Sequence, residues 1–289
     1  MRLRLLSLSL LAMALGFMSF GIRAQTRTID LGSLFDTGKS LVKSQSVGSM
    51  SEEEELSIGK EVVAATLGGY PPVRKPELQH RLNQVGVWIA LQSSRPELPW
   101  RFAAVESDTI NAFAAPGGTI LVTTGMLGHV ANEAELACVL GHEIGHVTRR
   151  HHIGVLQKSL LVSAGASALN IQSTSGGSEE YRKRLISESK EIFTRGLDRS
   201  SEREADEDGV LLAARAGYDP AACLNFMQRL ASLKADTGAL AALYKTHPTA
   251  KERVMDVDRA LGRLKGASPG EGARPGLTLN EAESGDKKE

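Results

Sequence analysis

The stretch His142-Glu143-Ile144-Gly145-His146 decides the fold of this chain, and it lies inside the longer segment NEAELACVLGHEIGHV, residues 132–147. Asn132 predicts the start of a helix, because Asn is a favoured N-cap residue. Residues four apart on a helix lie one turn apart, so His142 and His146 project to the same side. Two imidazoles at that spacing can hold one metal ion. Glu143, about 100° around the helix from His142, would lie beside the metal and could take a proton from a bound water.

The rest of this predicted helix favours a metal site over an ordinary core helix. Its apolar stripe consists of Leu136, Val139, Leu140 and Val147. Glu143 falls in the middle of that stripe, where a carboxylate is costly to bury without a cation or strong hydrogen-bond donors. Gly145 costs about 1 kcal/mol relative to Ala in a helix interior. A glycine there indicates that another element approaches this face of the helix closely.

A catalytic zinc site needs a third protein ligand and an open position for water. His152 has the spacing of one protease class, but Arg149 stands where that class requires a Gly, so we expect His152 to be a polar residue at a helix end. The segment Ser200–Asp206 is the better candidate. Its Glu202 and Asp206 share a helix face, so that one carboxylate could bind the metal while the other orients a ligand imidazole.

Composition excludes several other classes of protein. The 289 residues include 34 Lys and Arg against 34 Asp and Glu, which removes the electrostatic case for binding nucleic acid. Two cysteines cannot form a disulfide scaffold or a Cys-rich zinc module. Cys138 and Cys223 could pair in an oxidising compartment, but nothing in the sequence brings them together, and we expect Cys138 to be a buried free thiol.

The N-terminus has the order of a secretory signal. Arg2 and Arg4 precede an apolar run, and the small-residue site that follows predicts cleavage after Ala24, so that residues 1–24 are a signal peptide. An uncleaved membrane anchor is the alternative. Export predicts an oxidising compartment, and we expect residues 25–50 to form a linker or N-terminal arm.

At the other end, residues 264–289 are rich in Gly, Pro and charge, which predicts a disordered tail. The catalytic domain is therefore expected at 51–263, with a polar Gly/Ser break at 173–178. The fold class expected for this domain is α+β and mostly helical, with a small sheet.

Local patterns predict the elements before the metal-site helix. Ser51 followed by Glu52–Glu55 predicts an N-cap with acidic residues in the first turn, interpreted as a solvated face of a helix that ends near Leu67. A second helix is expected at about 77–92. Strands are expected at 100–105 and 119–124, with 111–114 either a strand or a loop.

Several ordered blocks resemble the M48 metallopeptidases. They are NAFAAPGG (111–118), TGML (124–127), NEAELA (132–137), HEIGHV (142–147), RH (150–151), EREAD (202–206), AGYDP (216–220), HP (247–248) and Arg253. The resemblance, over about residues 50–262, implies a zincin-like domain whose active-site helix carries HExxH.

The resemblance also implies roles for particular residues. His142, His146 and Glu202 would bind one zinc ion, Glu143 would be the general base, and Asp206 would orient a ligand. In similar proteins the His-Pro block lies over the active site. His247 is therefore a further catalytic candidate, which could occupy the open zinc position or donate to the oxyanion.

The function implied is that of a zinc metalloendopeptidase acting on unfolded or misassembled cell-envelope proteins, in other words protein quality control. A sheet edge near Phe113 or Ile120 could hold the substrate as an added strand. Together with the export signal, the resemblance implies a periplasmic protein. Peripheral association with a membrane is compatible with this interpretation, and binding to nucleic acid is not expected. A periplasmic holdase or assembly factor with latent peptidase activity is the alternative, and a hydrolase of small esters or amides is a third class.

Overall fold

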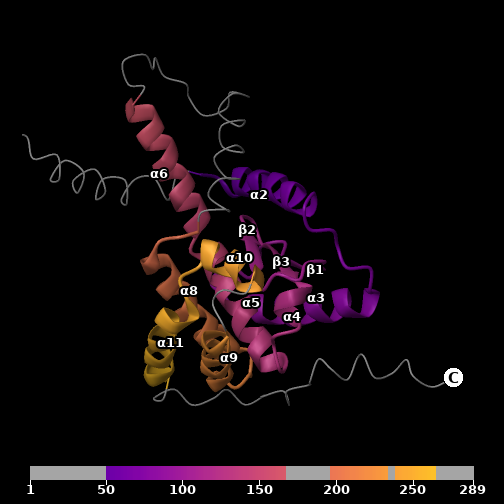
Figure 1. The fold of residues 1–289 in the computed structure, drawn as a ribbon. Coiled ribbons are helices and arrows are strands. Elements are labelled where there is room, and N and C mark those ends of the chain that lie inside the picture. The colour runs from indigo at the N-terminus through magenta and orange to yellow at the C-terminus, as the bar shows by residue number, and fades with distance from the viewer. Residues whose placement is uncertain (1–49, 167–195, 234–237, 265–289) are drawn as a thin grey trace, which may run out of the picture. The chain divides into compact units, whose positions relative to one another are not determined.

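The computed structural model describes residues 50–166, 196–233 and 238–264 (Figure 1). In chain order the elements are α2 (Glu52–Leu67), α3 (Pro76–Ala90), β1 (Arg101–Val105), β2 (Ala112–Ala115), β3 (Thr119–Thr123), α4 (Thr124–Leu127), α5 (Glu133–Thr148), α6 (His151–Ala166), α8 (Arg199–Arg215), α9 (Ala221–Ser232), α10 (Gly238–Thr246) and α11 (Ala250–Leu264). The predicted fold class is confirmed: the domain is mostly helical with one small sheet. None of the described helices is long and apolar enough to cross a membrane.

The sheet has the strand order β1-β3-β2. The central strand β3 pairs in parallel with β1 and antiparallel with β2. The segment 111–114, predicted as a strand or a loop, therefore belongs to the edge strand β2. Ile120 lies in the central strand, so the expectation of a sheet edge near Ile120 was wrong, and the edge is the one that carries Phe113.

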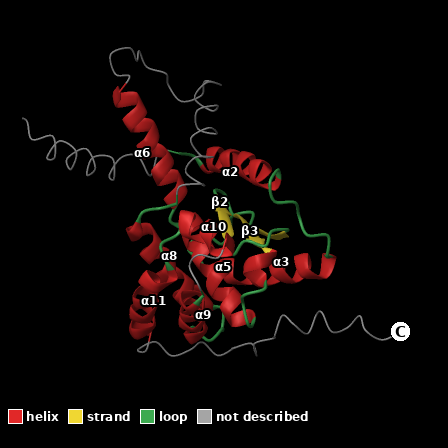
Figure 2. Cartoon of the chain, in the orientation of Figure 1, coloured by secondary structure: helices red, strands yellow, loops and turns green. Residues whose placement is uncertain are grey.

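Helix α5 lies at the centre of the domain, and every residue from Glu133 to Val147 is buried. Figure 2 shows the sheet on one side of α5 and helices α8, α9 and α11 on the other. The predicted N-cap is present, since the Asn132 side chain accepts a hydrogen bond from the Glu135 N–H at 3.0 Å. Because α5 is covered on all sides, its polar side chains must find partners within the protein.

The acidic run at the start of α2 is only partly a solvated face. Ser51 and Glu54 form a capping box, as the N-cap prediction requires. Glu55, however, is buried, and its carboxylate pairs with Arg95 at 2.9 Å and with Arg150 at 2.8 Å. The solvated-face interpretation was wrong for Glu55, because α2 packs so closely on the β2–β3 turn that a Cβ on Gly59 would meet the Pro116 carbonyl oxygen.

The expectation of a free thiol at Cys138 was also wrong. Cys138 in α5 and Cys223 in α9 form a disulfide, with their Cα atoms 5.2 Å apart. The physical reason is the packing of α9 against α5, which joins residues 85 positions apart in the chain.

Removing this disulfide should destabilise the domain. We expect Cys138→Ala combined with Cys223→Ala to lower the free energy of unfolding by about 4 kcal/mol, because the crosslink closes a long loop in the unfolded chain. Urea unfolding followed by circular dichroism measures the change, and reductant should lower the stability of the wild type to the same extent. Equal stability of the double variant and the oxidised wild type would contradict the expectation.

The predicted domain boundary at residue 263 falls within the last turn of α11. That helix continues to Leu264, and Arg263 pairs with Glu207 of α8 at 2.8 Å. The predicted signal peptide, the linker up to residue 49, the break at 173–178 and the tail from 265 lie outside the described residues.

Candidate active site

The site depends on how closely α5 and α8 approach each other. A Cβ on Gly141 would lie 3.0 Å from the Cα of Gly209, and one on Gly145 would lie 3.2 Å from the Cα of Ala205. The close approach expected at Gly145 is therefore made by α8. Because the two backbones nearly touch, short acidic side chains on α8 reach the histidines of α5.

Four buried side chains, the ligand cluster, meet at this crossing: His142, His146, Glu202 and His247. One ligand atom of each lies within 4.8 Å of the corresponding atoms of the other three. The Nε2 atoms of the two α5 histidines are 3.1 Å apart, and each lies 3.6 Å from a carboxylate oxygen of Glu202. The structure thus brings together all the metal-ligating residues expected from the sequence, whereas His152 lies outside the cluster.

The chemistry of the cluster fits a metal ion. The Oε1 atom of Glu202 is buried and has no hydrogen-bond partner among the described residues. A buried carboxylate oxygen without a partner is costly, and a cation would remove that cost. Two or three imidazole nitrogens with one carboxylate form a donor set typical of zinc.

Asp206 and Arg253 both contact the imidazole of the candidate ligand His142. The Nδ1 atom of His142 lies 3.0 Å from Asp206 Oδ1, and the Nε atom of Arg253 donates to Asp206 Oδ2 at 3.0 Å. Burial alone would raise the pKa of Asp206, but Arg253 and His142 hold this pKa well below its usual range. Nη2 of Arg253 lies 2.9 Å from the same Nδ1. A proton on Nδ1, directed at the ionised Asp206, would leave Nε2 to face the cluster.

Glu143 lies beside the cluster and is itself buried. Burial raises the pKa of this carboxyl above its ordinary value, against the opposing effect of His247 and His142. Its Oε1 lies 3.9 Å from His247 Nε2. Such a carboxylate is more basic than an exposed one, as a general base requires.

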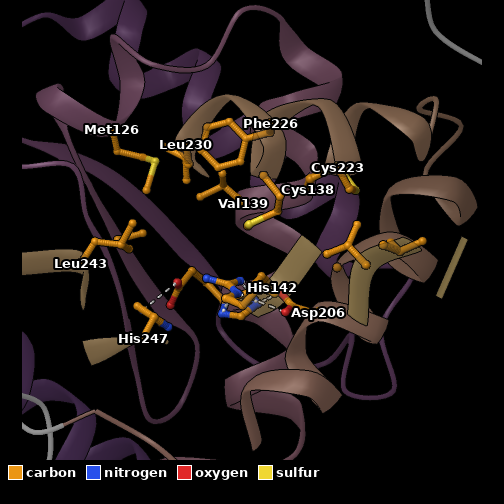
Figure 3. Close-up of a pocket in the computed structure, with 17 residues that line it drawn as sticks. Met126, Cys138, Val139, His142, Asp206, Cys223, Phe226, Leu230, Leu243 and His247 are labelled. Carbon is orange, nitrogen blue, oxygen red and sulfur yellow. Dashed lines mark hydrogen bonds and ion pairs between the residues drawn. A yellow bond between two sulfur atoms is a disulfide. The ribbon is translucent and has the colours of Figure 1, made fainter. Parts of the chain in front are cut away.

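An apolar pocket adjoins these groups, as Figure 3 shows. The apolar part of its wall includes Met126 of α4, Val139 of α5, Phe226 and Leu230 of α9, and Leu243 of α10. His142, Glu143 and His247 line the same pocket.

Asn111 is a buried residue beside the sheet to which sequence reasoning gave no role. It directly precedes the edge strand β2, and its buried Oδ1 has no hydrogen-bond partner among the residues that the structure describes. A second hollow runs along β2, between Ala112–Ala114 and the segment Thr246-His247. The one feature of the sequence that drew attention to Asn111 is its place as the first residue of the block NAFAAPGG.

This arrangement defines the class as a metallopeptidase domain of the zincin type. The chain belongs to Peptidase family M48, whose profile matches residues 75–261. The family predicted from the sequence is thereby confirmed.

Three relatives illustrate the similarity. The chain is 30% identical over 231 residues to the beta-barrel assembly-enhancing protease of Yersinia pestis, covering 75% of this chain and 46% of that protein. It is 27% identical over 277 residues to the protein of the same name from Escherichia coli K12, covering 91% of this chain and 54% of that protein. It is 34% identical over 157 residues to the mitochondrial metalloendopeptidase OMA1 of Arabidopsis thaliana, covering 54% of this chain and 30% of that protein. The chain spans about half the length of the assembly-enhancing proteases that it matches.

Proposed function

We propose that this protein is an exported zinc-dependent endopeptidase that hydrolyses peptide bonds of unfolded or misassembled cell-envelope proteins. The observation that carries the proposal is the buried cluster of His142, His146 and Glu202, with a carboxylate oxygen left without a hydrogen-bond partner, next to Glu143. Membership of family M48 supports the reaction class. The printed names of the bacterial relatives support substrates in the cell envelope.

In this proposal His142, His146 and Glu202 hold the zinc ion. The chemistry that zinc supplies in such a site is Lewis acidity, which lowers the pKa of water and polarises a carbonyl group. Glu143 accepts the proton of the attacking water and passes it to the leaving amine. Asp206 keeps His142 in the ligating tautomer, and Arg253 keeps Asp206 ionised.

Substrate selection follows from two features beside these groups. The edge strand β2 can accept an extended peptide through its backbone, which gives broad selection. The apolar pocket would hold an apolar side chain next to the scissile bond. Extended backbone and exposed apolar side chains occur together in unfolded proteins, which is why we propose these as substrates.

The proposed location is the periplasm. It is supported by the signal-like order of residues 1–24, and cleavage after Ala24 would leave a mature chain with the catalytic domain from about residue 51. Sequencing the N-terminus of protein recovered from a periplasmic extract tests the cleavage site. Recovery of the uncleaved chain in the membrane fraction would favour the anchor instead.

A holdase or assembly factor with latent peptidase activity is the second candidate, and the position of His247 favours it. The Nδ1 of His247 lies 2.9 Å from Glu202 Oε2, so this side chain occupies space within the ligand cluster. Incubating the mature chain with unfolded casein separates the two functions. Fragments that disappear with a chelator support the endopeptidase, and suppressed aggregation without fragments supports the holdase.

Replacing His247 distinguishes its two candidate roles. As a gate, His247 would occupy the open zinc position and inhibit the enzyme; as an oxyanion donor, it would stabilise the transition state. Because His247 contacts the proposed ligand Glu202 and faces Glu143, we expect that its removal opens the site, and that His247→Ala cleaves casein several-fold faster than the wild type. An oxyanion donor would give the opposite sign, a loss of roughly a hundredfold. Casein cleavage rates measured beside zinc content check the expectation, and an unchanged rate would leave His247 without a role in catalysis.

A further inference from the structure

The turn between α5 and α6 has a backbone conformation that ordinary side chains rarely adopt. Arg150 has φ 56°, the one positive φ at a non-glycine residue in the described part of the chain. On an uninterrupted helix, residues five apart point about 140° away from each other. Because the helix breaks here, the ring of His151 instead faces that of His146, with their Nδ1 atoms 2.9 Å apart.

This turn is held in place from two directions. The Arg150 guanidinium pairs with the buried carboxylate of Glu55 at 2.8 Å, while Arg149 pairs with Asp208 and Glu204 of α8. A left-handed conformation is unfavourable for a non-glycine residue, because Cβ approaches the following carbonyl oxygen. Such a conformation persists where its surroundings fix it, as these ion pairs do.

One arrangement of protons satisfies both hydrogen bonds of the chain His146–His151–Glu204. His146 Nε2 faces the ligand cluster, so as a ligand it offers a lone pair, and the ring proton resides on Nδ1. That N–H donates to Nδ1 of His151. The proton of His151 then lies on Nε2, which is 3.3 Å from Glu204 Oε2.

We propose that His151 is a positioning residue for the zinc ligand His146, and that Glu204 anchors His151 in turn. Each ligand imidazole of α5 is then oriented by a carboxylate. Asp206 contacts His142 directly, and Glu204 acts on His146 through His151. Outer partners of this kind fix the tautomer and orientation of a ligand histidine. The inference rests on the proposed function, since it requires zinc at the cluster.

The test compares replacements of His151 that separate packing from hydrogen bonding. His151→Phe keeps a ring in the buried space but has no acceptor, whereas His151→Asn keeps an oxygen near the position of Nδ1. His80→Phe, an exposed histidine on α3, is the matched control. Zinc affinity is measured by competition with a chromophoric chelator, and the visible absorption of the cobalt-loaded protein reports the geometry around the metal.

We expect His151→Phe to bind zinc 10–100-fold more weakly than the wild type and to shift the cobalt spectrum. His151→Asn should recover most of that affinity, and His80→Phe should match the wild type. Glu204 is 44% exposed, so Glu204→Gln should fold normally and lose affinity by a few-fold. If circular dichroism shows His151→Phe to be unfolded, the two single variants Glu204→Gln and His151→Asn still decide the test.

Wild-type affinity and an unchanged cobalt spectrum in His151→Phe would overturn the inference, as would His151→Asn being as weak as His151→Phe. Should His151→Phe not fold, wild-type affinity in Glu204→Gln would overturn it. These results would leave the proposed function intact. A wild-type chain that binds no zinc would instead overturn the proposed function, and the inference with it.

Discussion

Glu143→Gln is expected to lower the rate of casein cleavage by about 10²–10⁴-fold while zinc content and thermal stability stay at their wild-type values. The amide of Gln can hold a water molecule by hydrogen bonds but cannot accept its proton. Glu143 is not needed to hold the metal, because the cluster consists of His142, His146, Glu202 and His247. Cleavage is followed by gel electrophoresis, and metal content by elemental analysis of the same preparation.

The matched control for this variant is Glu61→Gln, the same chemical change at an exposed position of α2. It should cleave casein at the wild-type rate. If Glu143→Gln retained activity within a few-fold of the wild type, Glu143 could not be the general base. A variant that had lost its zinc would show a structural role instead, contrary to the assignment.

Glu202→Ala should reduce zinc affinity at least about a hundredfold, because it removes a ligand rather than an outer partner, whose loss costs 10–100-fold. The carboxylate of Glu202 is buried and faces both α5 histidines at 3.6 Å. Glu207→Ala on the same helix is the control, since Glu207 pairs with Arg263 away from the cluster. Glu204→Ala should fall between the two if Glu204 supports His146 through His151.

Zinc affinity is measured for the three variants by competition with the same chelator. Equal affinity in Glu202→Ala and Glu207→Ala would remove Glu202 from the ligand set. In that case the unpartnered Oε1 of Glu202 would need another explanation, and the third ligand would have to be sought at His247.

The features that could be predicted from the sequence are those that depend on local spacing. His142 and His146 share one face because a helix repeats every 3.6 residues, and the N-cap at Asn132 locates that helix. The interior Gly145 correctly indicated a close neighbour. Which helix that neighbour is, and that Glu202 would reach the histidines from it, could not be derived from spacing, and the resemblance to family M48 supplied the ligand set.

The incorrect predictions share a physical cause: each depends on contacts between distant parts of the chain. Glu55 looks like part of a solvated acidic turn until α2 is packed on the β2–β3 turn beside Arg150. Cys138 meets its partner only when α9 docks against α5. Ile120 could be assigned to a central strand only from the order of the strands. The contact between His151 and His146 likewise depends on the turn at Arg150, which no local signal marks.

The most direct test of the central claim is the restoration of casein cleavage as zinc is added back to the metal-free mature chain. The account predicts that the metal-free chain produces no fragments and that activity rises in proportion to added zinc up to one equivalent per chain. The Glu143→Gln variant should take up the same single equivalent and stay inactive. Casein fragments produced by the metal-free wild-type chain would contradict the account.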